Sequence, residues 1–143
     1  MEKKIYLTST DEDTRNLASK LTSQLVGGDV VLLFGPMGAG KTTFTQGIAA
    51  SLGISRLTSP TYVILNQYPI EHSSIKTLNH FDLYRLESED QLKSVNFEET
   101  ISDPESLSIV EWPEKLSKLP LSYYQINIEP ISVNQRQITF QKI

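Results

Sequence analysis

Apolar and polar positions alternate along much of the chain with the period of two that is typical of β-strands, and short continuous apolar runs mark strands buried on both faces. The clearest buried run is Val30-Val31-Leu32-Leu33-Phe34. Near the C-terminus, two alternating segments predict a closing hairpin. The whole pattern predicts strands over residues 3–8, 30–34, 61–68, 75–82, 106–111, 123–129 and 135–143.

The segment after the first predicted strand has the features of a helix start. Ser9-Thr10-Asp11-Glu12 provides a capping box, in which side chains bind the free N–H groups of the first turn. Leu17, Leu21 and Leu25 then follow at intervals of four residues and lie on one helix face. We expect this helix to end at Gly27-Gly28.

Two more helices complete the predicted set. One covers residues 42–53 and stops at a glycine, and a short one begins at Ser88-Glu89-Asp90-Gln91. The strands at 61–68 and 75–82 are joined by a polar loop and predict a hairpin. The simplest assembly is a single α/β domain over residues 1–143, with a mixed sheet, antiparallel flanking strands and helices on both faces.

Composition and charge narrow the class of protein. A length of 143 residues fits one domain with one core. The 17 acidic and 13 basic side chains give a net charge of −4, which disfavours a protein whose main task is to bind nucleic-acid phosphates by itself. Cysteine is absent, so disulfides and thiolate metal sites are excluded. No apolar signal segment follows the first residues and no run approaches about 18 apolar residues, so we expect a cytoplasmic protein.

Residues 35–42 form a complete phosphate-loop motif, Gly35-Pro36-Met37-Gly38-Ala39-Gly40-Lys41-Thr42. The motif stands between a predicted buried strand and a predicted helix, which is the context that such a loop requires. Its glycines let backbone N–H groups converge on a β-phosphate, and the helix presents its positive end to the same charge. Lys41 adds a positive charge at the β/γ oxygens, and the Thr42 hydroxyl can bind Mg²⁺. The sequence therefore predicts a P-loop NTPase-like domain with a nucleotide and Mg²⁺ site.

Two carboxylates are candidates for metal and water chemistry. Asp82 and Glu111 each end a predicted core strand, and ligands of open α/β sheets bind at the carboxyl ends of strands. One acid could hold Mg²⁺ through water, while the other could orient or deprotonate the attacking water. The alternative for each is a solvated carboxylate at a strand end. The residues alone do not decide which acid would hold the metal.

Three other features each allow two interpretations. The segment Thr58-Ser59-Pro60-Thr61-Tyr62 lies where nucleotide switches place a hydroxyl against the γ-phosphate, but it also fits a proline turn. Trp112, the only tryptophan, follows Glu111 and could lie beside the site or anchor the core. His80 and Tyr84-Arg85 could support the site or serve in packing and at the surface.

Four landmarks in this order resemble the bacterial TsaE (YjeE) family, the small ATPases of tRNA threonylcarbamoyladenosine biosynthesis. The resemblance runs from about residue 9 to residue 118. The landmarks are Gly38-Ala39-Gly40-Lys41-Thr42-Thr43-Phe44-Thr45-Gln46-Gly47, Ser59-Pro60-Thr61-Tyr62, His80-Phe81-Asp82-Leu83-Tyr84-Arg85-Leu86 and Glu111-Trp112. The phosphate loop alone is generic, whereas the set is specific.

The resemblance implies roles for individual residues. Lys41 is a catalytic residue, Asp82 is the Walker-B acid and Glu111 the second acid beside the nucleotide, and Thr42, Asp82 and Glu111 are the metal-binding set. Thr61 belongs to the switch, and Thr14 matches a threonine that lies near the base. The implied nucleotide-binding residues are Thr14, Gly38, Ala39, Gly40, Lys41, Thr42, Thr43, Thr61 and Trp112. The family loop usually carries Asp-Leu where this chain has Pro36-Met37, so a role of that Asp side chain is lost while the backbone cradle is kept.

The resemblance also implies a role in modifying the adenosine beside the anticodon. A TsaE-like protein would bind ATP and Mg²⁺, dock on the TsaD–TsaB heterodimer and use hydrolysis to reset that complex between turnovers, with tRNA contacted through the partners. Two other classes stay open. A small-molecule phosphotransferase would share the loop but usually needs a lid with several arginines, and the arginines form no cluster in the sequence. A non-hydrolytic nucleotide-binding module would keep Lys41 but need no water-positioning acid. A GTPase is disfavoured because an Asn-Lys-x-Asp motif is absent.

Overall fold

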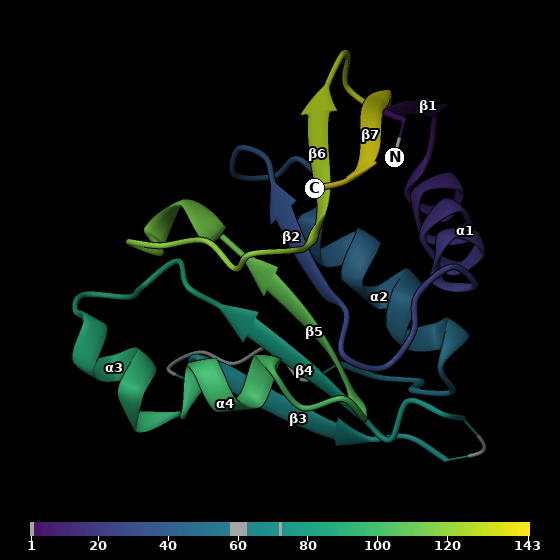
Figure 1. Cartoon of the computed structure of the whole chain (residues 1–143). Helices are drawn as coiled ribbons and strands as arrows, with labels where there is room; N and C mark the ends of the chain where they lie inside the picture. The colour runs from purple at the N-terminus through teal and green to yellow at the C-terminus, as the bar shows by residue number, and fades with distance from the viewer. Residues whose placement is uncertain (1, 58–62, 72) are drawn as a thin grey trace.

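A mixed β-sheet forms the centre of the protein in the computed structural model, which describes residues 2–57, 63–71 and 73–143 (Figure 1). Within these residues seven strands lie in the order β1-β7-β6-β2-β5-β4-β3. Their bounds are β1 (Lys4–Thr8), β2 (Val30–Phe34), β3 (Leu65–Pro69), β4 (Thr77–Asp82), β5 (Ser106–Glu111), β6 (Tyr124–Pro130) and β7 (Arg136–Lys142).

The direction of the strands divides the sheet into a parallel centre and antiparallel flanks. The central pairs β6 with β2, β2 with β5 and β5 with β4 are parallel, whereas β1 with β7, β7 with β6 and β3 with β4 pair antiparallel. The predicted mixed sheet with antiparallel flanks and both predicted hairpins are therefore confirmed. The parallel centre also brings the carboxyl ends of β2, β4 and β5 to one edge, where a ligand site is expected.

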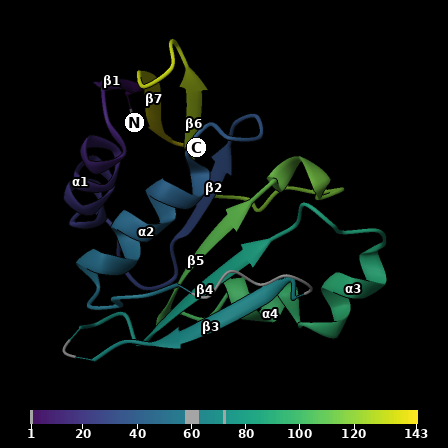
Figure 2. The same cartoon turned by 180° about the vertical axis from the view of Figure 1, so that it is seen from behind.

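Helices cover both faces of the sheet, as predicted (Figures 1 and 2). On one face lie α1 (Asp11–Thr22) and α2 (Lys41–Ser51), and on the other lie α3 (Glu89–Ser94) and α4 (Phe97–Ile101). The sequence of β2 explains this, because alternate side chains of a strand point to opposite faces. Val31 and Leu33 join the core on the α2 side, and Val30 and Leu32 join the core that includes Phe97 and Ile101.

Two boundaries differ from the sequence prediction by more than two residues, and one helix was not predicted. Helix α1 ends at Thr22, not at Gly27, because the next N–H groups bond to carbonyls three residues earlier and tighten the chain into turns. Leu25 still reaches the core from outside the helix. Helix α4 was not predicted; it begins after Asn96, whose backbone is left-handed with φ of 50°. Strand β3 was predicted from residue 61 but begins at Leu65, and just before it the Ile64 carbonyl still accepts a hydrogen bond from the Asp82 N–H at the end of β4.

The other predicted elements agree with the structure. Thr10 caps α1 by accepting a hydrogen bond from the Asp13 N–H, and Ser88 and Gln91 form the capping box of α3. A single 3₁₀ turn, η1 (Pro113–Lys115), follows β5. Within the described part of the chain, no helix has the length and apolar character that crossing a membrane requires.

Candidate nucleotide site

The glycine-rich loop joins the end of β2 to the start of α2, which is the predicted strand, loop and helix. Its backbone needs glycine at two positions, because Gly38 and Gly40 have φ of 78° and 110°. Gly40 is the residue before α2, and a Cβ atom there would lie 3.0 Å from the Arg136 side chain. The loop therefore keeps an open backbone surface at the N-terminus of an 11-residue helix, which is suited to an anion.

Lys41 is buried, with 5% of its surface exposed, and its ammonium has only uncharged partners. Nζ donates a hydrogen bond to the Gly35 carbonyl at 2.5 Å and lies 3.2 Å from the centre of the Trp112 ring. No carboxylate in the described residues lies within ion-pair distance of it. Burial lowers the pKa of Lys41, while the charges of Glu114, Glu111 and Asp82 oppose this shift. Such a lysine, held at a glycine loop without a counter-ion, fits a site for an anionic ligand.

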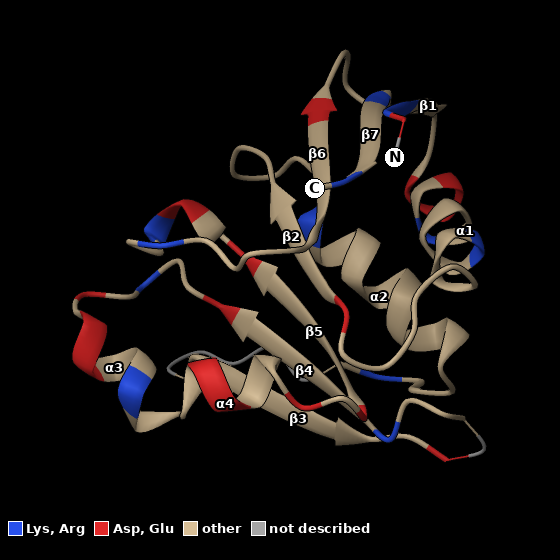
Figure 3. Ribbon diagram, viewed as in Figure 1, with Lys and Arg blue, Asp and Glu red and all other residues tan. Residues whose placement is uncertain are grey.

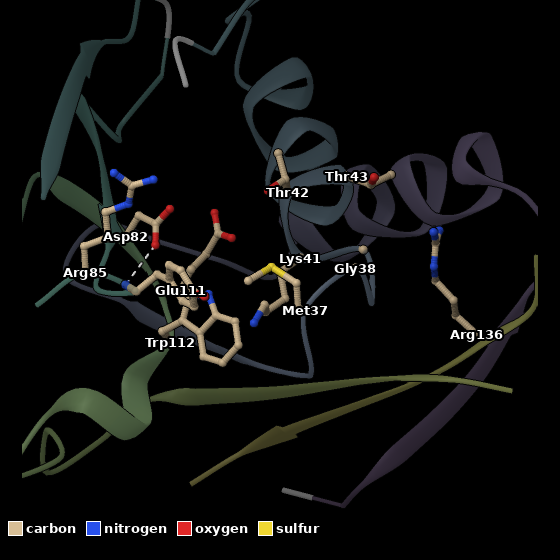
Figure 4. A pocket seen from close by; sticks show the side chains of 12 residues that line it. Met37, Gly38, Lys41, Thr42, Thr43, Asp82, Arg85, Glu111, Trp112 and Arg136 are labelled. Atoms are coloured by element: carbon tan, nitrogen blue, oxygen red, sulfur yellow. Dashed lines mark hydrogen bonds between the residues drawn. The ribbon is translucent and has the colours of Figure 1, made fainter. Parts of the chain in front are cut away.

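The two predicted acids lie on neighbouring strands. Asp82 and Glu111 are register partners and form the red carboxyl ends of β4 and β5 in Figure 3. Their side chains lie on the same face of the sheet as Leu78 and Ile109, which pack in the core with α2, and Figure 4 shows both carboxylates at the pocket. Asp82 is partly buried and accepts a hydrogen bond from the Tyr84 N–H at 3.1 Å. Glu111 is only 4% exposed, and its Oε2 lies 2.5 Å from His80 Nε2. Their environments therefore differ, with Asp82 the more accessible acid.

These groups surround one pocket of about 530 Å³ (Figure 4). Asp82, Glu111 and Trp112 lie at one end, while Gly38 and Arg136 lie at the other. An elongated ligand with charge at the acid end, such as a nucleoside triphosphate with its metal, fits this distribution. The residues that line the pocket are Met37, Gly38, Gly40, Lys41, Thr42, Thr43, Asp82, Tyr84, Arg85, Glu111, Trp112 and Arg136.

Two predicted site residues in the described part of the chain do not join the pocket wall. Ala39 is buried beneath the loop, and its N–H donates to the Pro36 carbonyl. Thr14 is fully buried in α1, where its hydroxyl and that of Thr8 share a hydrogen bond of 2.9 Å. Thr61 and the rest of the predicted switch lie outside the described residues. The described part of the chain contains no group of three or more His, Asp or Glu side chains arranged to hold a metal. The pocket wall offers oxygen groups of the kind that bind Mg²⁺ in Thr42, Asp82 and Glu111.

Trp112 combines the two interpretations that its sequence position allowed. Its backbone is left-handed, with φ of 59°, directly after Glu111. The ring lines the pocket beneath Lys41 and lies 5.1 Å from the Tyr84 ring, and it also packs against the core that contains Phe81. The indole therefore connects the ammonium of the loop to the packed core.

Arg136 is the pocket residue that sequence reasoning missed. It begins β7, its side chain is 15% exposed, and its Nη1 donates to the Asp11 carboxylate at 2.6 Å. No local motif marks it, because only the pairing of β7 with β6 and β1 brings it to the loop. Arg85 lines the other end, so two of the four arginines reach the pocket, from opposite sides (Figure 4). The folded chain thus brings arginines to the site that are far apart in the sequence, but it does not place these two together.

Comparisons with known proteins agree with this arrangement. The family model "Threonylcarbamoyl adenosine biosynthesis protein TsaE" matches residues 8–138. The tRNA threonylcarbamoyladenosine biosynthesis protein TsaE of Bacillus subtilis is 34% identical over 140 residues, which cover 96% of this chain and 85% of that protein. The protein of the same name from Nostoc is 38% identical over 127 residues, 86% of this chain and 75% of its own length. The crystal structure of Bacillus subtilis YdiB has a TM-score of 0.74 at 31% identity and covers 97% of this chain and 84% of its own, which confirms the fold.

Proposed function

Since the chain belongs to the TsaE family of threonylcarbamoyl adenosine biosynthesis proteins, we propose that it binds and hydrolyses Mg-ATP and uses the hydrolysis to reset the TsaD–TsaB complex. The family places the protein in tRNA threonylcarbamoyladenosine biosynthesis. The observation that supports the nucleotide chemistry is the buried Lys41 ammonium, for which the described residues provide no carboxylate within ion-pair distance, in a pocket that Asp82 and Glu111 also line.

Each group has a role in this proposal. The loop backbone and Lys41 bind the β- and γ-phosphates. To do so, Lys41 gives up its contacts with the Gly35 carbonyl and the Trp112 ring and binds phosphate oxygens instead. Thr42 and Asp82 hold Mg²⁺, which when bound neutralises charge on the phosphate oxygens. Asp82 suits this role because it is the more accessible acid. Glu111 orients the attacking water and accepts its proton at a carboxylate oxygen.

The proposed ATPase is slow in isolation. Its catalytic geometry would be completed only when the partner orders the segment around Thr61 beside Asp82 and Glu111. The net charge of −4 agrees with an accessory protein whose partners make most of the contacts with tRNA. A small-molecule phosphotransferase is the second candidate, and the observation in its favour is that Arg85 and Arg136 both line the pocket.

The decisive experiment mixes this protein with TsaD–TsaB, tRNA, ATP and threonylcarbamoyl-adenylate. We expect the partner pair to raise ATP turnover severalfold or more, and we expect about one round of tRNA modification per complex when this protein is omitted. Several rounds without this protein, or a high ATPase rate without partners, would exclude the reset role and favour the phosphotransferase. Nucleotide binding without turnover in the complete mixture would indicate a non-hydrolytic module.

A further inference from the structure

A buried histidine supports Glu111 from the neighbouring strand. His80 lies on β4 two residues before Asp82, so both side chains point to the α2 face of the sheet. The His80 ring is 4% exposed, and its Nε2 lies 2.5 Å from Oε2 of Glu111 on β5. An ionised carboxylate only accepts hydrogen bonds, so Nε2 carries the hydrogen and donates it.

The other ring nitrogen shows that this histidine is not explained by packing. Nδ1 of His80 is buried and is the one buried side-chain polar atom without a hydrogen-bond partner among the described residues. A buried polar atom without a partner destabilises the fold, and an apolar side chain between Leu78 and Phe81 on this strand would avoid that cost. The contact that remains to account for the residue type is the hydrogen bond to Glu111.

We propose that His80 is a positioning residue, which binds Oε2 of Glu111 and leaves Oε1 as the oxygen that serves the pocket. This inference rests on the proposed ATPase function. A carboxylate without that bond could rotate about its last torsion, and a base that is displaced by even a fraction of an ångström transfers protons poorly. His80 lies behind Glu111 and does not line the pocket, so nucleotide binding itself does not need it.

A pair of variants isolates the hydrogen bond from the polarity of the side chain. In His80→Gln the amide nitrogen takes about the place of Nε2, whereas in His80→Asn the shorter amide reaches only the place of Nδ1. We expect His80→Asn to lower partner-stimulated ATP turnover about 10- to 100-fold, the range typical of groups that orient an active residue. We expect His80→Gln to recover most of that loss. The Kd for ATP should change by less than about twofold in both variants. A purely structural defect would weaken ATP binding as well, so an unchanged Kd distinguishes a positioning role from such a defect.

A second comparison tests whether His80 acts through Glu111. In a Glu111→Gln background, His80→Asn should cause no further loss of turnover, since the positioned base is already absent. Independently of turnover, NMR of the ligand-free protein should show a downfield imidazole N–H proton that Glu111→Ala shifts upfield. The chain has only two histidines, and loss of the signal in His80→Gln assigns it.

Each result has a distinct meaning. Equal turnover in His80→Asn and the parent protein, additive losses in the Glu111→Gln background, or an imidazole proton insensitive to Glu111→Ala would overturn the inference. If the parent protein itself fails to hydrolyse ATP with its partners, the proposed function is wrong, and the NMR comparison still decides whether His80 holds Glu111.

Discussion

Gly47 lies where α2 crosses α1, and its replacement by alanine should destabilise the protein. Alanine in place of glycine inside a helix normally stabilises by about 1 kcal/mol. Here a Cβ atom would lie 2.4 Å from the backbone oxygen of Arg15 and 2.8 Å from the Ala18 Cβ. Ordinary contact begins at 3.4 Å, so the two helices would have to separate by about 1 Å.

The net effect follows from these opposing terms. Overpacking costs about 1–3 kcal/mol, and the upper end applies because the obstacle is backbone and not a flexible side chain. After the gain in helix propensity, we expect Gly47→Ala to lower the free energy of unfolding by about 2 kcal/mol. An unfolding entropy of about 2.1 cal/mol/K per residue converts this to a fall in Tm of about 7 °C for a chain of 143 residues.

Differential scanning calorimetry measures this change directly. Gln46→Ala is the matched control, because Gln46 is the exposed neighbour of Gly47 on α2 and should shift the free energy of unfolding by no more than about 0.5 kcal/mol. A Tm for Gly47→Ala equal to or above that of the parent would refute the reasoning, since it would mean that α1 and α2 do not approach as closely as these distances require.

Four further outcomes concern the pocket. Lys41→Ala should weaken Mg-ATP binding about 10- to 100-fold by calorimetry with an unchanged circular-dichroism spectrum, because a charge-assisted contact is removed from a preformed loop; an unchanged affinity would exclude this loop as the site. Because burial lowers the pKa of Lys41, the unfolded chain binds more protons between that pKa and 10.5, so the free energy of unfolding should rise with pH in this window for the parent relative to Lys41→Met. The opposite slope would contradict a buried cation. Asp82→Asn should weaken the Mg²⁺ dependence of nucleotide binding, whereas Glu111→Gln should keep binding and lose turnover, and a parental rate in Glu111→Gln would rule out its role. Trp112 emission should change on adding ATP or ADP, since Lys41 must leave the indole ring; emission that is insensitive to saturating nucleotide would mean that this contact persists.

Much of the fold is local in origin and could be predicted. The phosphate loop could be predicted from adjacent residues, because the apolar run of β2, the glycine loop and the following helix are continuous in the sequence. The alternating segments near the C-terminus predicted the β6–β7 hairpin for the same reason. Helix α4 escaped prediction because it is only five residues long and starts at an asparagine in a left-handed conformation, for which the sequence has no strong cap signal.

The sequence by itself determined the chemistry at each strand end: a lysine at a glycine loop, an aspartate at the end of β4 and a glutamate at the end of β5. Only the tertiary structure decided how these groups meet. The parallel pairing of β4 with β5 sets Asp82 opposite Glu111 and His80 behind it, although 29 residues separate the two acids in the chain. The order of the strands likewise brings Arg136 to the loop from the last strand. Local sequence cannot specify these long-range contacts, because strand order depends on how the whole core packs. The hydrophobic pattern around a residue predicts its helix or strand but not which distant residues it will contact.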